Sequence, residues 1–355
     1  MPDFDVIVVG GGPAGVISAL KCSQLGLNAL LIEQGDRGRH KPCGGVLTPA
    51  CVEILQETLK THLPQTVTCS PRTLGLYYVP PRGRRDGGRV KNYELLNVNR
   101  DLLDSWLLSY AMRSGVEVWT HTKFFEVRKL KPIEVLITKN NRVTKMTTKY
   151  LIGADGVYSR VRRQLRNATK LRTVTILQEY CHGEGEFEDC FYMFFRESIS
   201  PTYSYLIPKD GLYVIGVGLP RNYPIAISEA LNNFKNWLSE DFAFKLLASK
   251  RKETWAIPYG STFTGVENII LVGDAAGFCN ALSGEGIRLA VESGIAVGEA
   301  IQDAVSTNGS LALAYAQHVD ELTSFVRRTY RFAISLTDER REEFIKSELA
   351  RLPLG

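Results

Sequence analysis

Short apolar runs that end in glycine or an acidic residue alternate with amphipathic segments along this chain. Residues 5–9 form the first run, rich in valine, which is typical of a buried parallel strand. Residues 16–25 have the apolar content of a helix, and Gly26 follows as its end signal. Residues 28–32 are again apolar and lead into Glu33. The pattern predicts a strand–helix–strand unit of an α/β fold.

Further strands are predicted for residues 150–153, 190–195, 212–218 and 268–272. Residues 227–238 are predicted to form an amphipathic helix that covers a second sheet. From residue 311 to residue 352 the sequence is helical and charged. The charge run at residues 338–343 is expected to be a solvated helix face.

A glycine-rich turn joins the first strand to the first helix, with Gly10, Gly12 and Gly15 in the spacing G-x-G-x-x-G. Gly10 permits the tight turn, Gly12 lets a phosphate approach the backbone, and Gly15 lets the helix pack closely on the strand. The free N–H groups at the start of the helix favour a pyrophosphate. Glu33, at the end of the second strand, is placed to accept hydrogen bonds from ribose hydroxyls. This motif alone does not separate NAD from FAD.

Two later motifs separate them, because they resemble fingerprints of the p-hydroxybenzoate-hydroxylase-like flavoproteins. G-A-D-G-x-x-S-x-V-R occupies residues 153–162, and G-D-A-A-G occupies residues 273–277. The resemblance implies FAD as the cofactor, with Asp155 near its pyrophosphate and Asp274 accepting from a ribityl hydroxyl. It also implies that residues 284–287 open a helix whose N–H groups point at the flavin ring, where a positive helix end stabilises negative charge.

The motifs and the resemblance together assign a set of residues to FAD. The set is Gly10, Gly12, Pro13, Ala14, Gly15, Glu33, Gln34, Lys41, Cys43, Gly44, Gly45, Arg100, Asp155, Gly273, Asp274, Gly284, Glu285, Gly286 and Ile287. Asp155 would otherwise be an ordinary Asp-Gly turn, and Arg100 a solvated arginine at a helix start.

Three segments resemble the geranylgeranyl-reductase branch of these flavoproteins. They are K-P-C-G-G at residues 41–45, Y-S-Y-L-I-P-K at residues 203–209, and G-E-G-I at residues 284–287. The closer similarity is to a small bacterial branch linked to colicin M resistance. In the second segment Tyr205 stands where the family has Trp and Ile207 where it has Phe. Ala281 replaces a proline that commonly lines the substrate face, and this departure counts against a prenyl substrate.

The resemblance implies a Rossmann-type FAD-binding lobe with an inserted antiparallel-sheet substrate lobe and C-terminal helices. The first lobe is expected to comprise residues 1–72, 95–170 and 258–330, and the substrate lobe residues 73–94 and 171–257. Residues 331–355 are expected to form a C-terminal helical segment. A length of 355 residues permits a single compact unit, but two joined lobes are favoured.

The implied reaction is hydride transfer from reduced flavin to a carbon–carbon double bond of a hydrophobic, prenyl-like substrate. Cys43 and Tyr205 are the candidate catalytic residues. A nearby Lys41 would favour the Cys43 thiolate, although a small cysteine in a turn also packs well. Strand alternation places Tyr203, Tyr205 and Ile207 on one face, and Phe191 and Phe195 are further candidates for an apolar wall.

Other functions remain open at this stage. An FAD monooxygenase acting on a small aromatic or lipid substrate and a flavin-dependent halogenase would use the same scaffold. A non-catalytic flavin electron-transfer component is a third alternative. No second G-x-G-x-x-G follows a strand, so NAD(P)H would bind transiently, or ferredoxin or flavodoxin would deliver the electrons.

Composition indicates the class of protein and the compartment in which it is expected. The chain is 44% hydrophobic and 23% charged, as ordinary globular proteins are, with no apolar run of transmembrane length and no signal peptide expected. Seven cysteines without C-x-x-C spacing fit a reducing cytoplasm, and five scattered histidines do not predict a metal site.

The net charge is +5, with arginines clustered in two places. The clusters are Arg82, Arg84, Arg85 and Arg89 around residues 80–88, and Arg327, Arg328 and Arg331 near the C-terminus. A solvated basic loop is the simpler interpretation; contact with anionic lipids at the inner face of a membrane is the alternative. Nucleic-acid binding is not expected, because no recognition module accompanies the charge.

Overall fold

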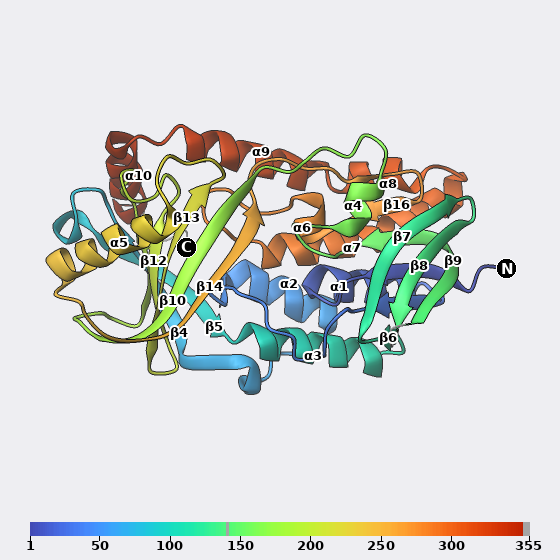
Figure 1. Ribbon diagram of the computed structural model, residues 1–355, viewed down its shortest axis with the longest axis horizontal. Coiled ribbons are helices and arrows are strands. Elements are labelled where there is room, and N and C mark those ends of the chain that lie inside the picture. The colour runs from blue at the N-terminus through green and yellow to red at the C-terminus, as the bar shows by residue number, and fades with distance from the viewer. Residues whose placement is uncertain (140–141, 351–355) are drawn as a thin grey trace.

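The computed structural model describes residues 1–139 and 142–350, and in these the strands form two eight-stranded sheets (Figure 1). The first sheet contains β1 (Phe4–Val9), β2 (Ala29–Ile32), β6 (Glu117–Trp119), β7 (Thr122–Leu130), β8 (Ile133–Lys139), β9 (Arg142–Gly153), β15 (Gly265–Val266) and β16 (Ile269–Leu271). The second contains β3 (Val46–Leu47), β4 (Thr68–Val79), β5 (Gly88–Val98), β10 (Thr173–Glu184), β11 (Cys190–Phe194), β12 (Ser204–Lys209), β13 (Leu212–Pro220) and β14 (Lys245–Pro258). The α/β architecture expected from the sequence is confirmed.

The helices are α1 (Pro13–Gln24), α2 (Pro49–Leu59), α3 (Arg100–Arg113), α4 (Arg160–Gln164), α5 (Ile227–Phe242), α6 (Gly273–Ala276), α7 (Ile287–Thr307), α8 (Leu311–His318), α9 (Asp320–Ile334) and α10 (Asp338–Ala350). Two short 3-10 turns, η1 (Gln65–Val67) and η2 (Arg84–Asp86), flank β4. Residues 351–355 of the expected C-terminal helical segment lie outside the described residues.

The first sheet has a parallel centre, in the order β16-β9-β1-β2-β6. β1, β2 and β16 are buried on both faces, which explains why the sequence of β1 is almost uniformly apolar. The long helix α7 packs beside α1 on one face (Figure 1). Because β1, β2, β9 and β16 run in the same direction, their carboxyl ends meet at one edge of the sheet, where α/β proteins bind ligands.

The second sheet is mainly antiparallel, with its two faces in different surroundings. Phe194 of β11 packs against Phe234 and Trp237 of α5, and these rings form one apolar cluster. Tyr205 and Ile207 of β12 point to the opposite face, into a second apolar cluster. The alternation expected for this strand is therefore confirmed.

The second sheet is wider than the expected segments 73–94 and 171–257. β3 joins it through pairing of Val46 with Asn97 and of Leu47 with Leu96, and β4 begins at Thr68. β5 continues to Val98 and leads directly into α3. The two sheets are therefore connected by continuous elements rather than by linkers.

The C-terminal charge run was expected to form a solvated helix face, and this was wrong for Arg341. The Arg341 side chain is buried, donates to the carbonyl oxygen of Pro201 at 2.7 Å, and pairs with Asp338 at 3.1 Å. Ile345, one helical turn further, packs into the second apolar cluster. α10 turns this face toward the second sheet, a tertiary contact that a charge pattern alone does not reveal.

The arginines around residues 80–88 are partly paired with acidic side chains. Arg84 forms an ion pair with Glu186 at 3.4 Å, and Arg89 one with Glu188 at 3.8 Å. The backbone N–H of Arg82 donates to Glu342 of α10. Within the described part of the chain, no helix is both long and apolar enough to span a bilayer.

Replacing Phe234 by Ala tests the packing of α5 on the second sheet. Phe234 is fully buried, and its ring lies 4.9 Å from the ring of Phe194, centroid to centroid. Because the substitution removes a large side chain and leaves a cavity, we expect it to lower the free energy of unfolding by about 3–5 kcal/mol. Urea denaturation measures the loss. Leu313→Ala, at an exposed position of α8, should change stability little, and equal losses in both variants would contradict the packing described here.

Candidate functional site

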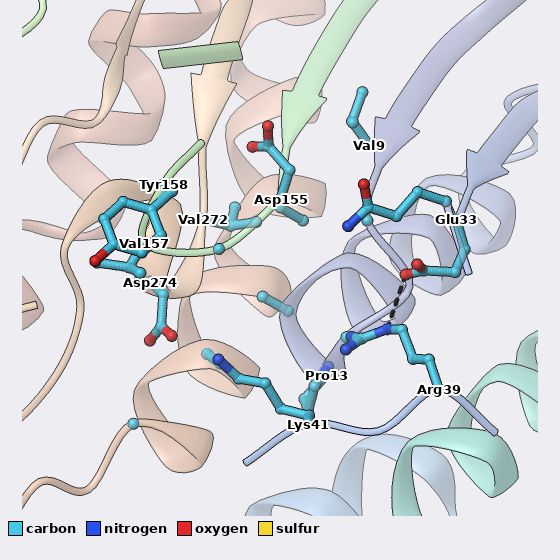
Figure 2. Close-up of a pocket in the computed structure, with 18 of the residues that line it drawn as sticks. Val9, Pro13, Glu33, Arg39, Lys41, Asp155, Val157, Tyr158, Val272 and Asp274 are labelled. Carbon is cyan, nitrogen blue, oxygen red and sulfur yellow. Dashed lines mark hydrogen bonds and ion pairs between the residues drawn. The ribbon is translucent and has the colours of Figure 1, made fainter. Parts of the chain in front are cut away.

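A cavity of about 510 Å³ opens at the carboxyl edge of the first sheet, within the usual range for ligand sites of about 300–1,000 Å³ (Figure 2). Fourteen of the residues expected at the cofactor line it. They are Gly10, Gly12, Pro13, Ala14, Glu33, Gln34, Lys41, Cys43, Arg100, Asp155, Asp274, Gly284, Gly286 and Ile287. Segments spread over most of the chain thus contribute to one cavity.

The turn after β1 has no room for side chains at two of its glycines. Gly10 has φ = +110°, and a Cβ atom there would overlap the carbonyl group of Ala154. A Cβ atom on Gly15 would overlap the carbonyl oxygen of Gly10. Gly12 precedes α1 without a side-chain cap, and Pro13 occupies the first turn. The first N–H groups of α1 are therefore left for a ligand at the cavity wall.

Glu33 is buried beside this turn and holds it in place. Its carboxylate accepts hydrogen bonds from the N–H groups of Gly11 at 2.7 Å and Gly35 at 2.9 Å. Arg39 pairs with the same carboxylate at 3.0 Å, as Figure 2 shows, and approaches Asp104 of α3 at 3.5 Å. Sequence reasoning missed Arg39; the only signal was a basic residue between the second strand and the K-P-C-G-G segment.

The G-A-D-G-x-x-S-x-V-R motif forms the turn between β9 and α4. Asp155 Oδ2 accepts from the N–H groups of Arg160 and Val161, whereas Oδ1 is buried without a partner in the described structure. Burial raises the pKa of Asp155. Arg162 donates to the carbonyl oxygen of Ala275 at 2.5 Å, so this turn is tied directly to the G-D-A-A-G motif.

The other end of the cavity is formed by Asp274 and the residues that precede α7. Gly286 is the residue before the helix and provides no side-chain cap, so N–H groups of the first turn face the cavity region. A Cβ atom on Gly286 would lie 3.6 Å from Asp274 Oδ1 and 3.8 Å from the Cys279 sulfur. Burial raises the pKa of the Cys279 thiol well above its ordinary value.

Cys43 lies between this end of the cavity and the start of α3. Its sulfur accepts from the N–H group of Gly45 at 3.3 Å. Arg100, at the first position of α3, forms a two-point ion pair with Asp104 at 3.0 Å. Burial acts to lower the pKa of Arg100, but Asp104 and Cys43 together raise it on balance. Arg100 therefore stays charged beside the thiol.

The remaining predicted residues do not line the cavity. Gly15, Gly44, Gly45 and Gly273 lie behind its wall, where side chains would meet neighbouring atoms. Glu285 instead pairs with Arg288 at 3.1 Å and accepts from the Thr48 hydroxyl at 2.6 Å. Tyr205 donates from its hydroxyl to Gln178 Oε1 at 2.9 Å, and burial raises its pKa well above the ordinary value. The catalytic role expected for Tyr205 stays a prediction.

Trp255 and Ile257 of β14 also line the cavity and were not singled out from the sequence. They belong to the apolar cluster that contains Tyr203, Tyr205 and Phe191. Their strand was not predicted from the sequence. The one signal for these two residues was their spacing of two, which places both side chains on the same face of a strand. The cavity is therefore polar along the sheet edge and aromatic where the two sheets meet.

These features fit an extended flavin dinucleotide. The glycine turn leaves backbone N–H groups free, an acid lies at each end, and the buried Asp155 oxygen lacks a partner. Residues 3–178 match the family model of the FAD binding domain. The match shows that this segment, residues 3–178, belongs to the FAD-binding-domain family. Its cofactor is FAD.

Known proteins resemble the chain in sequence and in structure. Protein CbrA of Escherichia coli strain K12 is 29% identical over 304 residues, which are 82% of this chain and 82% of CbrA. A geranylgeranyl bacteriochlorophyll reductase-like protein of Thermoplasma acidophilum superposes with a TM-score of 0.82 at 21% identity, covering 98% of this chain and 92% of its own. A mutant of the halogenase PltM in complex with FAD gives a TM-score of 0.71 at 17% identity, covering 91% and 74%.

The p-hydroxybenzoate-hydroxylase-like fold is thereby confirmed, and the chain is an FAD-dependent oxidoreductase by family and fold. Because proteins of different activity share this fold, the fold does not fix the reaction.

Gly15→Ala tests the close packing of helix α1 against the glycine turn that follows β1. The added methyl group would collide with the carbonyl oxygen of Gly10, and overpacking of this kind costs about 1–3 kcal/mol, so we expect FAD to bind roughly tenfold more weakly. Fluorescence titration of apoprotein with FAD measures the affinity. Gly38→Ala is the matched control, because no atom of the described residues beyond its chain neighbours lies within 4 Å of the added methyl group. Unchanged FAD affinity in Gly15→Ala would contradict the arrangement of the turn.

Proposed function

We propose that the protein is an FAD-dependent reductase of carbon–carbon double bonds in a hydrophobic, prenyl-like substrate. The observation that carries this proposal is the meeting of a thiol and an aromatic wall at one end of the cofactor cavity. Cys43, Trp255 and Ile257 all line the cavity, and Ile257 approaches Gly284 before the start of α7. Tyr203 and Phe191 belong to the same apolar cluster as Trp255 and Ile257. A wall of this kind suits an apolar substrate with few polar anchors.

FAD, when bound, supplies the hydride chemistry, so the protein itself must bind, orient and protonate. In this proposal the turn at Gly10 and Gly12 holds the pyrophosphate, and Glu33 receives the ribose hydroxyls. Asp274 accepts from the ribityl chain, and the first turn of α7 directs N–H groups at the ring edge. Each of these residues lines the cavity.

Cys43 is the proposed proton donor to the substrate carbon. Arg100 is charged and buried beside the thiol and would stabilise the thiolate left after proton transfer. Tyr203 is a weaker candidate, because its hydroxyl donates to the carbonyl oxygen of Ser283 at 2.6 Å, and burial raises its pKa. Ala281, where the family resemblance implies proline, packs in the same aromatic cluster.

NAD(P)H or a small electron carrier such as ferredoxin or flavodoxin would provide the electrons. A transient encounter at the inner face of a membrane would provide the substrate. Arg327, Arg328 and Arg331 are exposed on α9, close in sequence to the exposed apolar side chains of Phe332 and Ile334. Basic and apolar groups together on one helix suit an anionic lipid surface.

Cys43→Ala tests the proposed proton transfer. We expect the variant to keep FAD, because only the thiol is removed, and to reduce substrate about 100-fold more slowly, within the range for loss of a general acid. The measurement is anaerobic reoxidation of the photoreduced protein by a geranylgeranyl lipid in a stopped-flow instrument. Cys190→Ala, a buried cysteine of β11 outside the cavity, is the control. Equal rates in both variants would remove Cys43 from the mechanism.

Oxygen uptake separates the reductase from a monooxygenase, an alternative that the shared fold keeps in view. A reductase should consume no oxygen in proportion to substrate when NADPH or reduced ferredoxin supplies electrons. Substrate-stimulated NADPH oxidation with equal oxygen consumption would favour the monooxygenase. Rapid electron exchange with a carrier, without turnover of any prenyl substrate, would instead favour an electron-transfer component.

A further inference from the structure

A second cavity of about 510 Å³ lies on the other side of the segment that contains Lys41 and Cys43. Lys41, Cys43 and Arg100 line both cavities, so the two are neighbours. We call this second space the basic cavity. Its lining residues are His40, Lys41, Cys43, Val98, Asn99, Arg100, Asp101, Tyr180, His182, Lys209, Asp210, Leu212, Lys250 and Arg251.

Positive charge predominates in the basic cavity. Five of its side chains are lysine or arginine, two are histidine and two are aspartate. Both aspartates are engaged locally: Asp101 with His40 at 2.8 Å, and Asp210 with the N–H group of Ser70 at 2.7 Å. Within residues 1–139 and 142–350, Lys41 and Lys250 form no ion pair. Arg100 and Arg251 are paired with Asp104 and Glu253, and Lys209 donates to the carbonyl oxygens of Gly45 and Val98. Lys250 and Lys41 are therefore the cations left for an anionic ligand.

An irregularity in β14 directs two adjacent cations to this cavity. In a regular strand, neighbouring side chains point to opposite faces. Here Tyr180 of β10 pairs with Arg251 and the next residue, Cys181, pairs with Ser249, so Lys250 is an extra residue in a β-bulge. Both Lys250 and Arg251 consequently line the basic cavity. Bulges are frequent beside active sites, where they redirect a side chain.

The remaining walls suit a ligand that is anionic at one end only. Arg251 stacks over the Tyr180 ring at 4.3 Å and pairs with Glu253 at 2.7 Å, which fixes its position. Val98 and Leu212 add apolar surface, and Cys43 lies at the boundary with the cofactor cavity. A ligand held at Lys250 could therefore extend toward Cys43.

We propose that the basic cavity binds the phosphate or diphosphate group of a second ligand and so places the rest of that ligand near the cofactor. Several cations around one site match a group with two or more negative charges. A phosphorylated substrate and a pyridine dinucleotide both carry such a group. The proposal rests on the proposed function only for the identity of this ligand, not for the binding of phosphate.

Lys250→Gln tests the proposal, with inorganic pyrophosphate as the probe and FAD-saturated protein so that the cofactor site is filled. We expect one pyrophosphate to bind per chain, and the variant to bind it roughly threefold to tenfold more weakly, since a single partly exposed ion pair contributes modestly. Titration calorimetry measures the affinity at low and moderate salt. Lys245→Gln is the control, because Lys245 is an exposed lysine on the same strand outside the cavity.

Competition identifies the source of the phosphate. If a dinucleotide supplies it, NADPH displaces pyrophosphate, and Lys250→Gln raises the NADPH concentration needed for half-maximal flavin bleaching. If the substrate supplies it, farnesyl diphosphate displaces pyrophosphate and farnesol does not. Absent binding, or equal affinity in the wild type, Lys250→Gln and Lys245→Gln, would overturn the proposal. Pyrophosphate binding requires no turnover, so failure of the reductase activity alone leaves this proposal intact.

Discussion

The close approach of Gly10 to Ala154 is the constraint on which the rest of the structure depends. A side chain at Gly10 would overlap the carbonyl group of Ala154, so the ends of β1 and β9 can meet only through glycine. Backbone hydrogen bonds extend this contact across four strand ends: Gly10 to Ile32, Ala154 to Val9, and Val272 to Gly153. Each acidic residue that follows one of these strands is thereby brought to the same sheet edge.

A second set of contacts joins this edge to segments far along the chain. Arg162 donates to Ala275, and the N–H group of Gly273 donates to Ser293 of α7 at 3.0 Å. These bonds fix the start of α7 relative to the glycine turn, although the two lie far apart in the sequence, at Ile287 and Gly12. Strand ends and the start of α7 therefore set both ends of the dinucleotide site, and the segment from Gln34 to Cys43 supplies further lining residues.

Motifs predicted the parts of the site whose geometry is local. A glycine turn after a strand has one dominant structure, so its position at the cavity followed from sequence. The positions of Arg39 and of the extra residue Lys250 could not be predicted in this way, because they depend on contacts with other strands and helices. Glu285 pairs with Arg288, which lies three residues further along the chain, so this ion pair is local. The family resemblance instead assigned the Glu285 carboxylate to FAD.

The segment from His40 to Cys43 couples the two sheets and separates the two cavities. His40 bonds to Asp101 of α3 at 2.8 Å and to Glu253 of β14 at 2.6 Å, which holds the segment from both sides. Lys41 extends toward Asp274 in the cofactor cavity, as Figure 2 shows, yet it also lines the basic cavity. A ligand bound on one side must therefore alter the electrostatic field on the other, because both share the same cation.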